Sequence, residues 1–330
     1  MDLLLIGLSR FARRRVLPAV AAVPGITAVS VASRHAGATG HCDASGHGDV
    51  TGNADATGHV PLHRDWRRAL ETCPPGLAYV SLTNDEHADA VRQALEHGWH
   101  VVVDKPALPE LSTAVRMVEL ARRSSLVIAE ATCYAFHPMF SVIARHAAAA
   151  TKAVAVFTPP VPPDDFRHDR ARGGGALLDT GPYLASLGRV LWGHEPEEVS
   201  VMVTDRTPDG LGLSYSALVR YAGGRTAVGH FGFTSAYRNA LQLLGREEVV
   251  DVERPFSLPP DTGPTLTVQR DGAQHVHRLP SADSMELFLR RVVSAVRTGS
   301  REFDEPLLSD ARTLDRLRRA AGEGGVGGGR

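Results

Sequence analysis

Short apolar runs and helix-like repeats alternate through the first 131 residues. Apolar runs fall at residues 2–6, 26–32, 77–82, 100–103 and 126–131. The segments between them place apolar residues every three or four positions, as amphipathic helices do. Short apolar runs between helices are typical of parallel strands that are covered on both faces. The pattern therefore predicts a doubly wound, Rossmann-type α/β domain over residues 1–126.

The alternation stops after residue 131, and longer strand-like runs then follow one another directly. The expected strands are residues 152–158, 197–205, 213–223, 225–236, 239–245 and 265–272. One apolar helix interrupts them at 173–193, and two amphipathic helices are expected around 285–298 and 307–320. We therefore expect a second domain over residues 127–330, with an open, mostly antiparallel sheet and a flexible glycine-rich tail at 322–330. The sheet face without helices needs a partner, which predicts a homodimer or homotetramer.

Composition narrows the class of protein. The chain has 43% apolar and 22% charged residues and a net charge of −1, which argues against a nucleic-acid partner. Its three cysteines follow no disulfide or zinc spacing, so we expect free thiols and a cytoplasmic protein. No apolar run has the length of a signal peptide or a membrane span, so no membrane partner is expected.

A repetitive insert interrupts the first domain at residues 36–60. Its hexapeptides are rich in Gly, His and Asp and include Cys42. These side chains could bind a metal, but a run so poor in apolar residues is more typical of a flexible surface loop. We therefore predict no metal site.

The first turn has the chemistry of a dinucleotide site. It keeps the first glycine of the usual fingerprint, has alanine at the third position and serine at the second. Such a turn brings backbone N–H groups to a pyrophosphate at a helix N-terminus. The predicted contacts are Gly7, Ser9, Arg10, Phe11 and Ala12.

The end of the second strand indicates which nicotinamide cofactor binds. NAD sites usually place an acid there, whereas this chain has Ser33, Arg34 and His35. Because an arginine can bind a 2′-phosphate through two hydrogen bonds, we predict NADP(H) rather than NAD.

A lysine stands at the tip of a buried strand. Residues 100–103 are followed by Asp104, Lys105 and Pro106. Open α/β sheets bind their ligands at the carboxyl ends of strands, so we predict that Asp104, Lys105 and Pro106 contact the cofactor. Leu82 and Thr83, at the end of the preceding strand, are also predicted cofactor contacts. His87 lies one turn into the next helix and is predicted to contact the cofactor, with a solvated side chain as the alternative.

These segments resemble the glucose–fructose oxidoreductase and inositol dehydrogenase family, also called Gfo/Idh/MocA. The resemblance rests on "DKP" at 104–106, "HP" at 137–138 and "GGGALLDTGPY" at 173–183. Asp104 stands where the family usually has glutamate. Tyr183, "FTPPVPPDDFR" at 157–167 and "AYRN" at 236–239 are similar to C-3 ketoreductases that act on nucleotide-linked ketosugars in deoxysugar and antibiotic biosynthesis.

The resemblance implies an NADP-dependent oxidoreductase that reduces a ketosugar to an alcohol. Tyr183 would donate the proton, Lys105 would stabilise the substrate oxygen, and Asp179 would orient the substrate or pair with the lysine. The implied substrate-binding residues are Lys105, Tyr134, His137, Phe166, Arg167, Asp179, Tyr183 and Tyr237. Two alternatives remain: a dehydrogenase of a sugar, inositol or aminoglycoside hydroxyl, and a catalytically silent NADP-binding protein.

Overall fold

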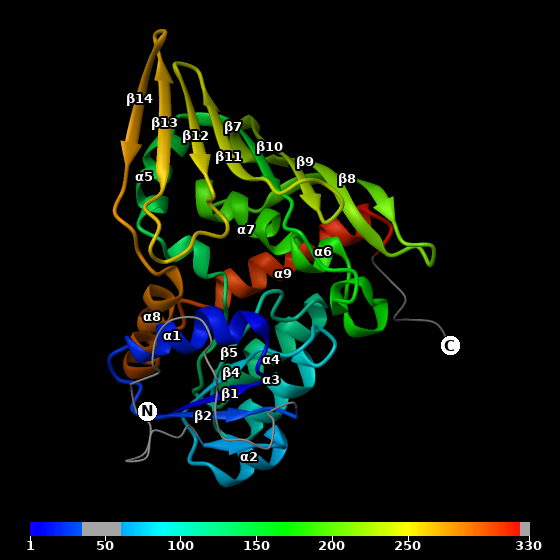
Figure 1. Cartoon of the computed structure of the whole chain (residues 1–330), viewed down its shortest axis with the longest axis vertical. Coiled ribbons are helices and arrows are strands. Elements are labelled where there is room, and N and C mark those ends of the chain that lie inside the picture. The colour runs from blue at the N-terminus through cyan, green and yellow to red at the C-terminus, as the bar shows by residue number, and fades with distance from the viewer. Residues whose placement is uncertain (35–60, 324–330) are drawn as a thin grey trace. The chain divides into compact units, whose positions relative to one another are not determined.

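The chain divides into two compact units that do not follow one another simply along the sequence. The computed structural model describes residues 1–34 and 61–323 (Figure 1). Unit 1 comprises Met1–Leu108, Ser112–Cys133 and Met285–Leu307, and unit 2 comprises Pro109–Leu111, Tyr134–Ser284 and Leu308–Arg330. The first unit therefore extends past the predicted boundary at residue 126. It also includes a segment near the end of the chain, Met285–Leu307.

Unit 1 is built on the predicted parallel sheet. Its strands are β1 (Leu3–Ile6), β2 (Val29–Ala32), β3 (Leu62–His63), β4 (Leu77–Val80), β5 (His100–Val103) and β6 (Ile128–Glu130). They are parallel throughout and lie in the order β3-β2-β1-β4-β5-β6. Every residue of β1 and β4 is buried, as expected of strands covered on both faces. The Rossmann-type prediction is confirmed.

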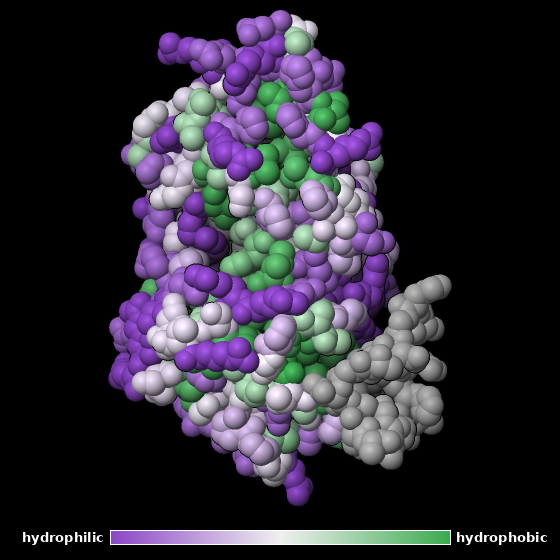
Figure 2. Space-filling view, turned by 90° about the vertical axis from the view of Figure 1, so that its left-hand side faces the viewer, coloured by the Kyte–Doolittle hydropathy of each residue, from purple (hydrophilic) through white to green (hydrophobic). Residues whose placement is uncertain are grey.

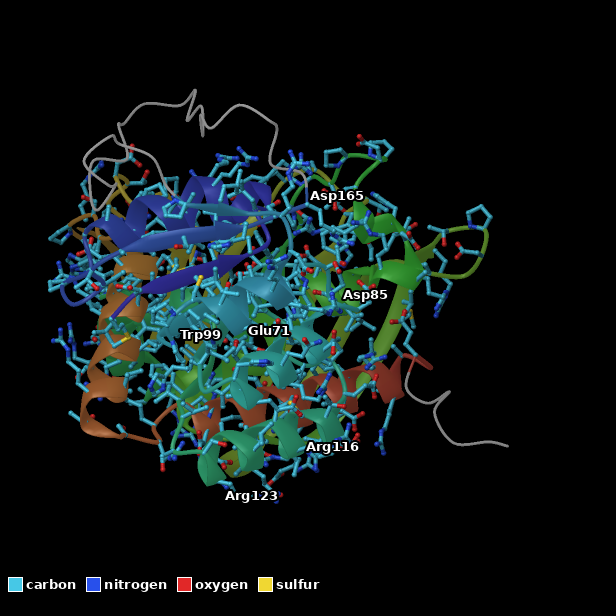
Figure 3. The ribbon with its side chains drawn as sticks, turned by 90° about the horizontal axis from the view of Figure 1, so that it is seen from below. Glu71, Asp85, Trp99, Arg116, Arg123 and Asp165 are labelled. Carbon is cyan, nitrogen blue, oxygen red and sulfur yellow. The ribbon has the colours of Figure 1, made fainter. Side chains whose placement is uncertain are left out.

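Helices connect these strands. They are the π-helix η1 (Ala12–Val16), α1 (Leu17–Ala21), α2 (Trp66–Thr72), α3 (His87–Glu96) and α4 (Leu111–Arg123). Asp65 caps α2 by accepting a hydrogen bond from the backbone N–H of Arg67. The polar side of α4 carries Arg116 and Arg123, which point outward in Figure 3. Among the described residues, no helix is long and apolar enough to span a bilayer.

The helix α8 (Ser284–Thr298) belongs to unit 1 rather than to the second domain, where the sequence prediction had placed it. The Arg290 side chain donates a hydrogen bond to the carbonyl of Ala22 at 3.0 Å, which links α8 to the end of α1. In the segment that follows, Arg301 donates to the Leu126 carbonyl and Asp304 accepts from Arg122 at 2.6 Å. These contacts join residues far apart in sequence, which periodicity cannot reveal.

The described residues of unit 2 form an eight-stranded sheet in the order β14-β13-β12-β11-β7-β10-β9-β8. Its strands are β7 (Ala150–Phe157), β8 (Pro196–Arg206), β9 (Gly212–Tyr221), β10 (Arg225–Gly232), β11 (Asn239–Gly245), β12 (Glu248–Glu253), β13 (Thr265–Arg270) and β14 (Ala273–Arg278). Only the β7–β10 pair among them is parallel, so the mostly antiparallel prediction is confirmed. β12 and β14 were not predicted, because charged residues dilute β12 and every residue of β14 is exposed.

One face of this sheet is covered by the helices α5 (Met139–Ala147), α6 (Ala176–Asp179), α7 (Gly181–Trp192) and α9 (Asp304–Ala320) (Figure 1). Leu184 and Leu187 of α7 and Leu314 and Leu317 of α9 belong to the same buried core as the inward side chains of the strands. α5 had not been predicted, and the single helix expected at 173–193 is interrupted at Thr180, between α6 and α7. Short 3₁₀ turns complete the unit at Cys133–Phe136, Phe166–His168, Arg170–Arg172 and Ala222–Gly224.

The packing of α7 on the sheet depends on a glycine. A Cβ at Gly188 would lie 2.0 Å from the ring of Tyr221, which is fully buried. Any side chain at position 188 would therefore push α7 away from β9.

In the upper part of Figure 2, which shows another side of unit 2, apolar side chains gather in the middle of the surface and hydrophilic ones surround them.

Candidate functional site

The turn after β1 lies tightly against the end of β4. Gly7 has a φ of 86°, and a Cβ there would be 2.3 Å from the carbonyl oxygen of Ser81, so only glycine fits. Ser9 Oγ accepts a hydrogen bond from the backbone N–H of Ala12 at 3.0 Å. Arg10 and Phe11 are exposed on the outer side of the turn. The structure thus has the glycine turn that the sequence predicts at the carboxyl end of β1.

The end of β2 carries an exposed cation that already has a partner. Arg34 Nη2 donates to both carboxylate oxygens of Glu86, at 3.0 and 3.2 Å. The Arg34 side chain is nevertheless 66% exposed, so its remaining N–H groups are accessible to solvent. Ser33 is half-buried beside it. His35 and the insert at 36–60 lie outside the described residues.

His87 is buried rather than solvated. It is fully buried, and its Nδ1 and Nε2 lie 3.0 Å from the Pro106 carbonyl and 3.2 Å from the Leu82 carbonyl. The ring therefore joins the loop after β4 to the loop after β5. The solvated alternative for His87 is therefore wrong, whereas its contact with a cofactor stays a prediction. Thr83 donates to Glu86 at 3.2 Å in the same region.

The loop after β5 is held from several sides. Asp104 Oδ1 accepts from the Tyr79 hydroxyl at 2.7 Å, and its Oδ2 accepts from the Ser81 hydroxyl at 2.5 Å. Burial raises the pKa of Asp104, although both hydrogen bonds and the nearby Lys105 oppose the rise. The peptide from Lys105 to Pro106 is cis. The next backbone N–H, that of Ala107, donates to Glu130 Oε2 at 2.7 Å.

Tyr183 lies at the start of α7 in an aromatic cluster. Its ring centroid is 4.9 Å from that of Phe157, 5.4 Å from that of Phe256 and 5.7 Å from that of Tyr134. Tyr134 is buried and its hydroxyl is 2.6 Å from Ser186 Oγ. Tyr134 thus packs against Tyr183, and its own hydroxyl is bonded inside the protein. Burial raises the pKa of the Tyr134 phenol.

Asp179 at the end of α6 pairs with an arginine of the preceding loop. Arg167 Nε is 2.9 Å from Asp179 Oδ1, and Arg167 Nη1 is 2.9 Å from Asp165 Oδ1. The guanidinium also lies 4.8 Å from the ring centroid of Phe166. Asp165, which Figure 3 labels, was missed from the sequence; its only signal was an acid two residues before the predicted arginine. Three predicted substrate residues are therefore brought together in unit 2.

His137 has a buried donor without a partner. Its Nδ1 accepts from the backbone N–H of Met139 at 3.1 Å, so the proton of a neutral ring is on Nε2. That Nε2 is buried and has no hydrogen-bond partner among the described residues. Burial also lowers the pKa of His137, which favours the neutral ring. Tyr237, by contrast, is 48% exposed, with Arg254 over its ring at 5.9 Å.

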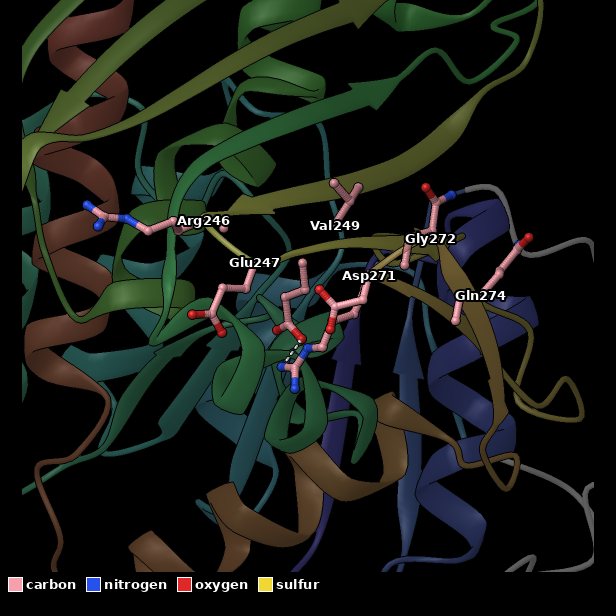
Figure 4. A pocket seen from close by; sticks show the side chains of 11 residues that line it. Arg246, Glu247, Val249, Asp271, Gly272 and Gln274 are labelled. Atoms are coloured by element: carbon pink, nitrogen blue, oxygen red, sulfur yellow. Dashed lines mark hydrogen bonds and ion pairs between the residues drawn. The ribbon is translucent and has the colours of Figure 1, made fainter.

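The candidate residues fall into two sets. The turn, Arg34, Asp104 and Lys105 belong to unit 1, whereas His137, Arg167, Asp179 and Tyr183 belong to unit 2. In the described ranges, no group of three or more His, Cys, Asp or Glu side chains could hold a metal ion. A polar hollow at the tips of the β11–β12 and β13–β14 hairpins contains none of the predicted residues (Figure 4). It is lined by charged side chains such as Arg246 and Glu247.

Two family models match the chain. Residues 1–132 match an oxidoreductase family with an NAD-binding Rossmann fold, and residues 149–250 match the GFO/IDH/MocA C-terminal domain. Similar curated proteins include the dTDP-3,4-didehydro-2,6-dideoxy-alpha-D-glucose 3-reductases of Saccharopolyspora spinosa and Streptomyces violaceoruber. They are 29% and 30% identical, and each alignment covers 74% of this chain and 76% of the relative.

Solved structures extend the similarity to almost the whole chain. A 3-ketoreductase from Actinomadura kijaniata, described in complex with TDP-benzene and NADP, is 26% identical with a TM-score of 0.85. The match covers 97% of this chain and 98% of the other. From the two family models and these relatives, we conclude that the protein belongs to the Gfo/Idh/MocA family of oxidoreductases.

Proposed function

We propose that the protein uses NADPH to reduce the C-3 ketone of a nucleotide-linked deoxysugar to an alcohol. The observation that carries the proposal is the similarity, over 97% of the chain, to a 3-ketoreductase described with both NADP and a TDP compound. Two curated relatives named as 3-reductases of a dTDP-linked sugar support the same substrate class.

The residues of unit 1 fit the cofactor. The tight turn at Gly7, which only glycine can form, leads into the helix whose first backbone N–H groups can bind a pyrophosphate. Arg34, with Ser33, would bind the 2′-phosphate that distinguishes NADP from NAD. When the cofactor is bound, it supplies the hydride that reduces the carbonyl carbon.

The protein's own groups complete the reaction at the carbonyl oxygen. As negative charge develops on that oxygen, the Lys105 ammonium stabilises it, and the Tyr183 hydroxyl transfers its proton to it. The products are the secondary alcohol and a tyrosinate that regains its proton from solvent. The aromatic contacts of Tyr183 support this role, because they restrict the ring and so fix where its hydroxyl lies.

Substrate binding would use the polar groups of unit 2. The partnerless Nε2–H of His137 is an expected donor to a substrate oxygen, since a buried donor without an acceptor costs free energy. Asp179, held by Arg167, can accept from a sugar hydroxyl. Phe166 and Tyr237 would add ring contacts to the substrate.

We also propose that two copies associate through the helix-free face of the unit 2 sheet. Val154, Val228 and Leu218 are directly paired across β7, β10 and β9 and are 37%, 46% and 51% exposed. A continuous apolar row on central strands is costly to leave in water, so a second copy is its expected cover.

The direct test of function is a substrate panel followed at the nicotinamide absorbance. It contains dTDP-linked 3-ketosugars, free ketosugars and polyols, each with NADPH, NADP, NADH and NAD. We expect oxidation of NADPH only with the nucleotide-linked ketosugars. Turnover confined to polyols with NADP or NAD would instead support the dehydrogenase alternative. Tight NADPH binding without turnover of any compound would support a silent binding protein.

A further inference from the structure

A partly buried chain of hydrogen-bonded side chains joins the ends of three adjacent strands of unit 1. Ser9 follows β1, Ser81 follows β4 and Asp104 follows β5. Ser9 Oγ is 2.8 Å from Ser81 Oγ, and Ser81 Oγ is 2.5 Å from Asp104 Oδ2. Tyr79, on β4, reaches the other carboxylate oxygen at 2.7 Å. The carboxylate therefore lies at one end of a continuous path that begins in the nucleotide-binding turn.

The proton order in this path is fixed by counting donors. Ser81 has one hydroxyl proton and donates it to Asp104, so the bond between the two serines must be donated by Ser9. Ser9 Oγ in turn accepts from the Ala12 N–H at 3.0 Å. Each hydroxyl thus accepts on one side and donates on the other, in a single direction toward the carboxylate. Such aligned hydrogen bonds strengthen one another in a buried setting.

The path needs an ionised carboxylate, because both oxygens of Asp104 accept hydrogen bonds. A protonated acid or an amide would have to donate toward one hydroxyl and reverse its direction. Burial works against the ionised form, while the positive charge on Lys105 favours it. Asp104, which directly precedes the proposed substrate lysine, is thus linked to the turn that would hold the cofactor.

The path also gives Ser9, at the second fingerprint position, a role other than that of a small residue in place of glycine. Its hydroxyl proton is directed into the sheet, so the side chain cannot donate to a pyrophosphate. Ser9 can then offer the cofactor only its backbone N–H group, and the direction of the backbone N–H groups of the turn depends on where Ser9 is held. We propose that Asp104 is a positioning residue that fixes the nucleotide-binding turn through Ser81 and Ser9. This inference rests on the proposed cofactor, though not on the proposed sugar.

The test is a double-mutant cycle on NADPH affinity, measured by titration of nicotinamide fluorescence in the full-length protein. Ser9→Gly restores the usual glycine fingerprint. If Ser9 had no role beyond replacing glycine, this variant would keep the NADPH affinity of the wild type. We expect instead that Ser9→Gly and Ser81→Ala each weaken binding about tenfold. The double variant should also lose only about tenfold, because either change breaks the same path.

Asp104 supplies the matched pair of variants. Asp104→Asn, which keeps the shape but must donate on one side, should weaken NADPH binding about tenfold. Asp104→Glu keeps a carboxylate and should recover affinity to within about threefold of the wild type. Asp89→Asn, in an exposed carboxylate network of α3, is the control and should leave binding unchanged. Melting temperatures of all variants identify any change that unfolds the protein rather than moving the turn.

Several outcomes would overturn the inference. Wild-type affinity in Ser9→Gly or in Asp104→Asn would show that the path does not set the turn. Losses that multiply to about a hundredfold in the double variant would show two independent effects. A wild-type protein that binds no nicotinamide dinucleotide would defeat both this inference and the proposed function. A protein that binds NADPH but reduces no ketosugar would defeat the proposed function alone.

Discussion

The guanidinium of Arg167 lies between two carboxylates, with its Nε 2.9 Å from Asp179 Oδ1 and its Nη1 2.9 Å from Asp165 Oδ1. Burial alone would lower the pKa of Arg167. The two carboxylates outweigh this effect and raise the pKa above its ordinary value. Within unit 2, Asp179 therefore has an arginine partner, and its charge is compensated. This ion pair is compatible with the substrate-orienting role that the resemblance implied, and both roles given for Asp179 stay predictions.

Arg167→Ala should lower kcat/KM by about tenfold or more, because Asp179 would lose both its position and its compensating charge. Arg167→Lys should recover part of the loss, since it restores the charge without the planar fork. The measurement is steady-state kinetics on the best substrate of the panel. Arg170→Ala is the control, because Arg170 is exposed and its nearest carboxylate, Asp209, is 3.9 Å away. Equal losses in both variants would argue against a specific role for Arg167.

Tyr183→Phe keeps the aromatic packing and removes only the hydroxyl. It should lower kcat by about 10²–10⁴-fold without changing NADPH affinity or the melting temperature. Lys105→Ala should cost at least as much, and Lys105→Arg should recover it only in part. Turnover of each variant is measured beside its cofactor affinity. Near-wild-type turnover in Tyr183→Phe would transfer the proton-donor role to Lys105 or to water.

Arg34→Ala should weaken NADPH binding by about ten- to a hundredfold and leave NADH binding nearly unchanged. The lost contact to a 2′-phosphate corresponds to roughly 1.5–3 kcal/mol. Arg67→Ala is a suitable control, since Arg67 is an exposed arginine of the same unit that is paired with Asp89. Both affinities are measured by the fluorescence titration. A wild-type preference for NADH would show that the cofactor assignment from Arg34 is wrong.

Glu248 should make the stability of unit 2 depend on pH. Burial opposes its charge, but hydrogen bonds from His146 and Arg270 outweigh this and lower the pKa of Glu248. A carboxylate with a lowered folded pKa stabilises the fold above its unfolded pKa, about 4.5, and this contribution is lost as the pH falls below that value. Melting curves should show Glu248→Gln less stable by about 1 kcal/mol at pH 7. Around pH 3 the gap should narrow, whereas a constant gap would contradict the assignment.

Leu218→Asp and Val228→Asp should reduce the size of the protein in solution to that of a monomer. A charge in the middle of an apolar interface has no partner and must be desolvated. Sedimentation or light scattering at micromolar concentration measures the mass. Val276→Asp is the control, because Val276 is 54% exposed on the edge strand β14, away from the central row. A wild-type protein that is already monomeric would exclude the proposed association.

Local pattern in the sequence was sufficient for the two sheet types, for most of their strands and for the position of the nucleotide turn. Buried strands such as β1 and β4 are apolar throughout, and the turn at Gly7 needs a residue without a side chain, so composition and spacing reveal both. Lys105 was predicted as a site residue from its place at a strand end, and the structure places it just after β5. The strands β12 and β14 and the helix α5 were not found, because their stability comes from pairing and packing more than from their own apolar period.

The tertiary structure alone decided which polar groups meet. His87 looked like a solvated residue in the first turn of a helix, yet the fold surrounds it with two backbone carbonyls from separate loops. Ser81 and Asp104 are 23 residues apart, and Arg167 and Asp179 stand in different elements. α8 returns to unit 1 from the far end of the chain. Periodicity reports which face of an element is buried, but the partner on that face is set by how elements pack together.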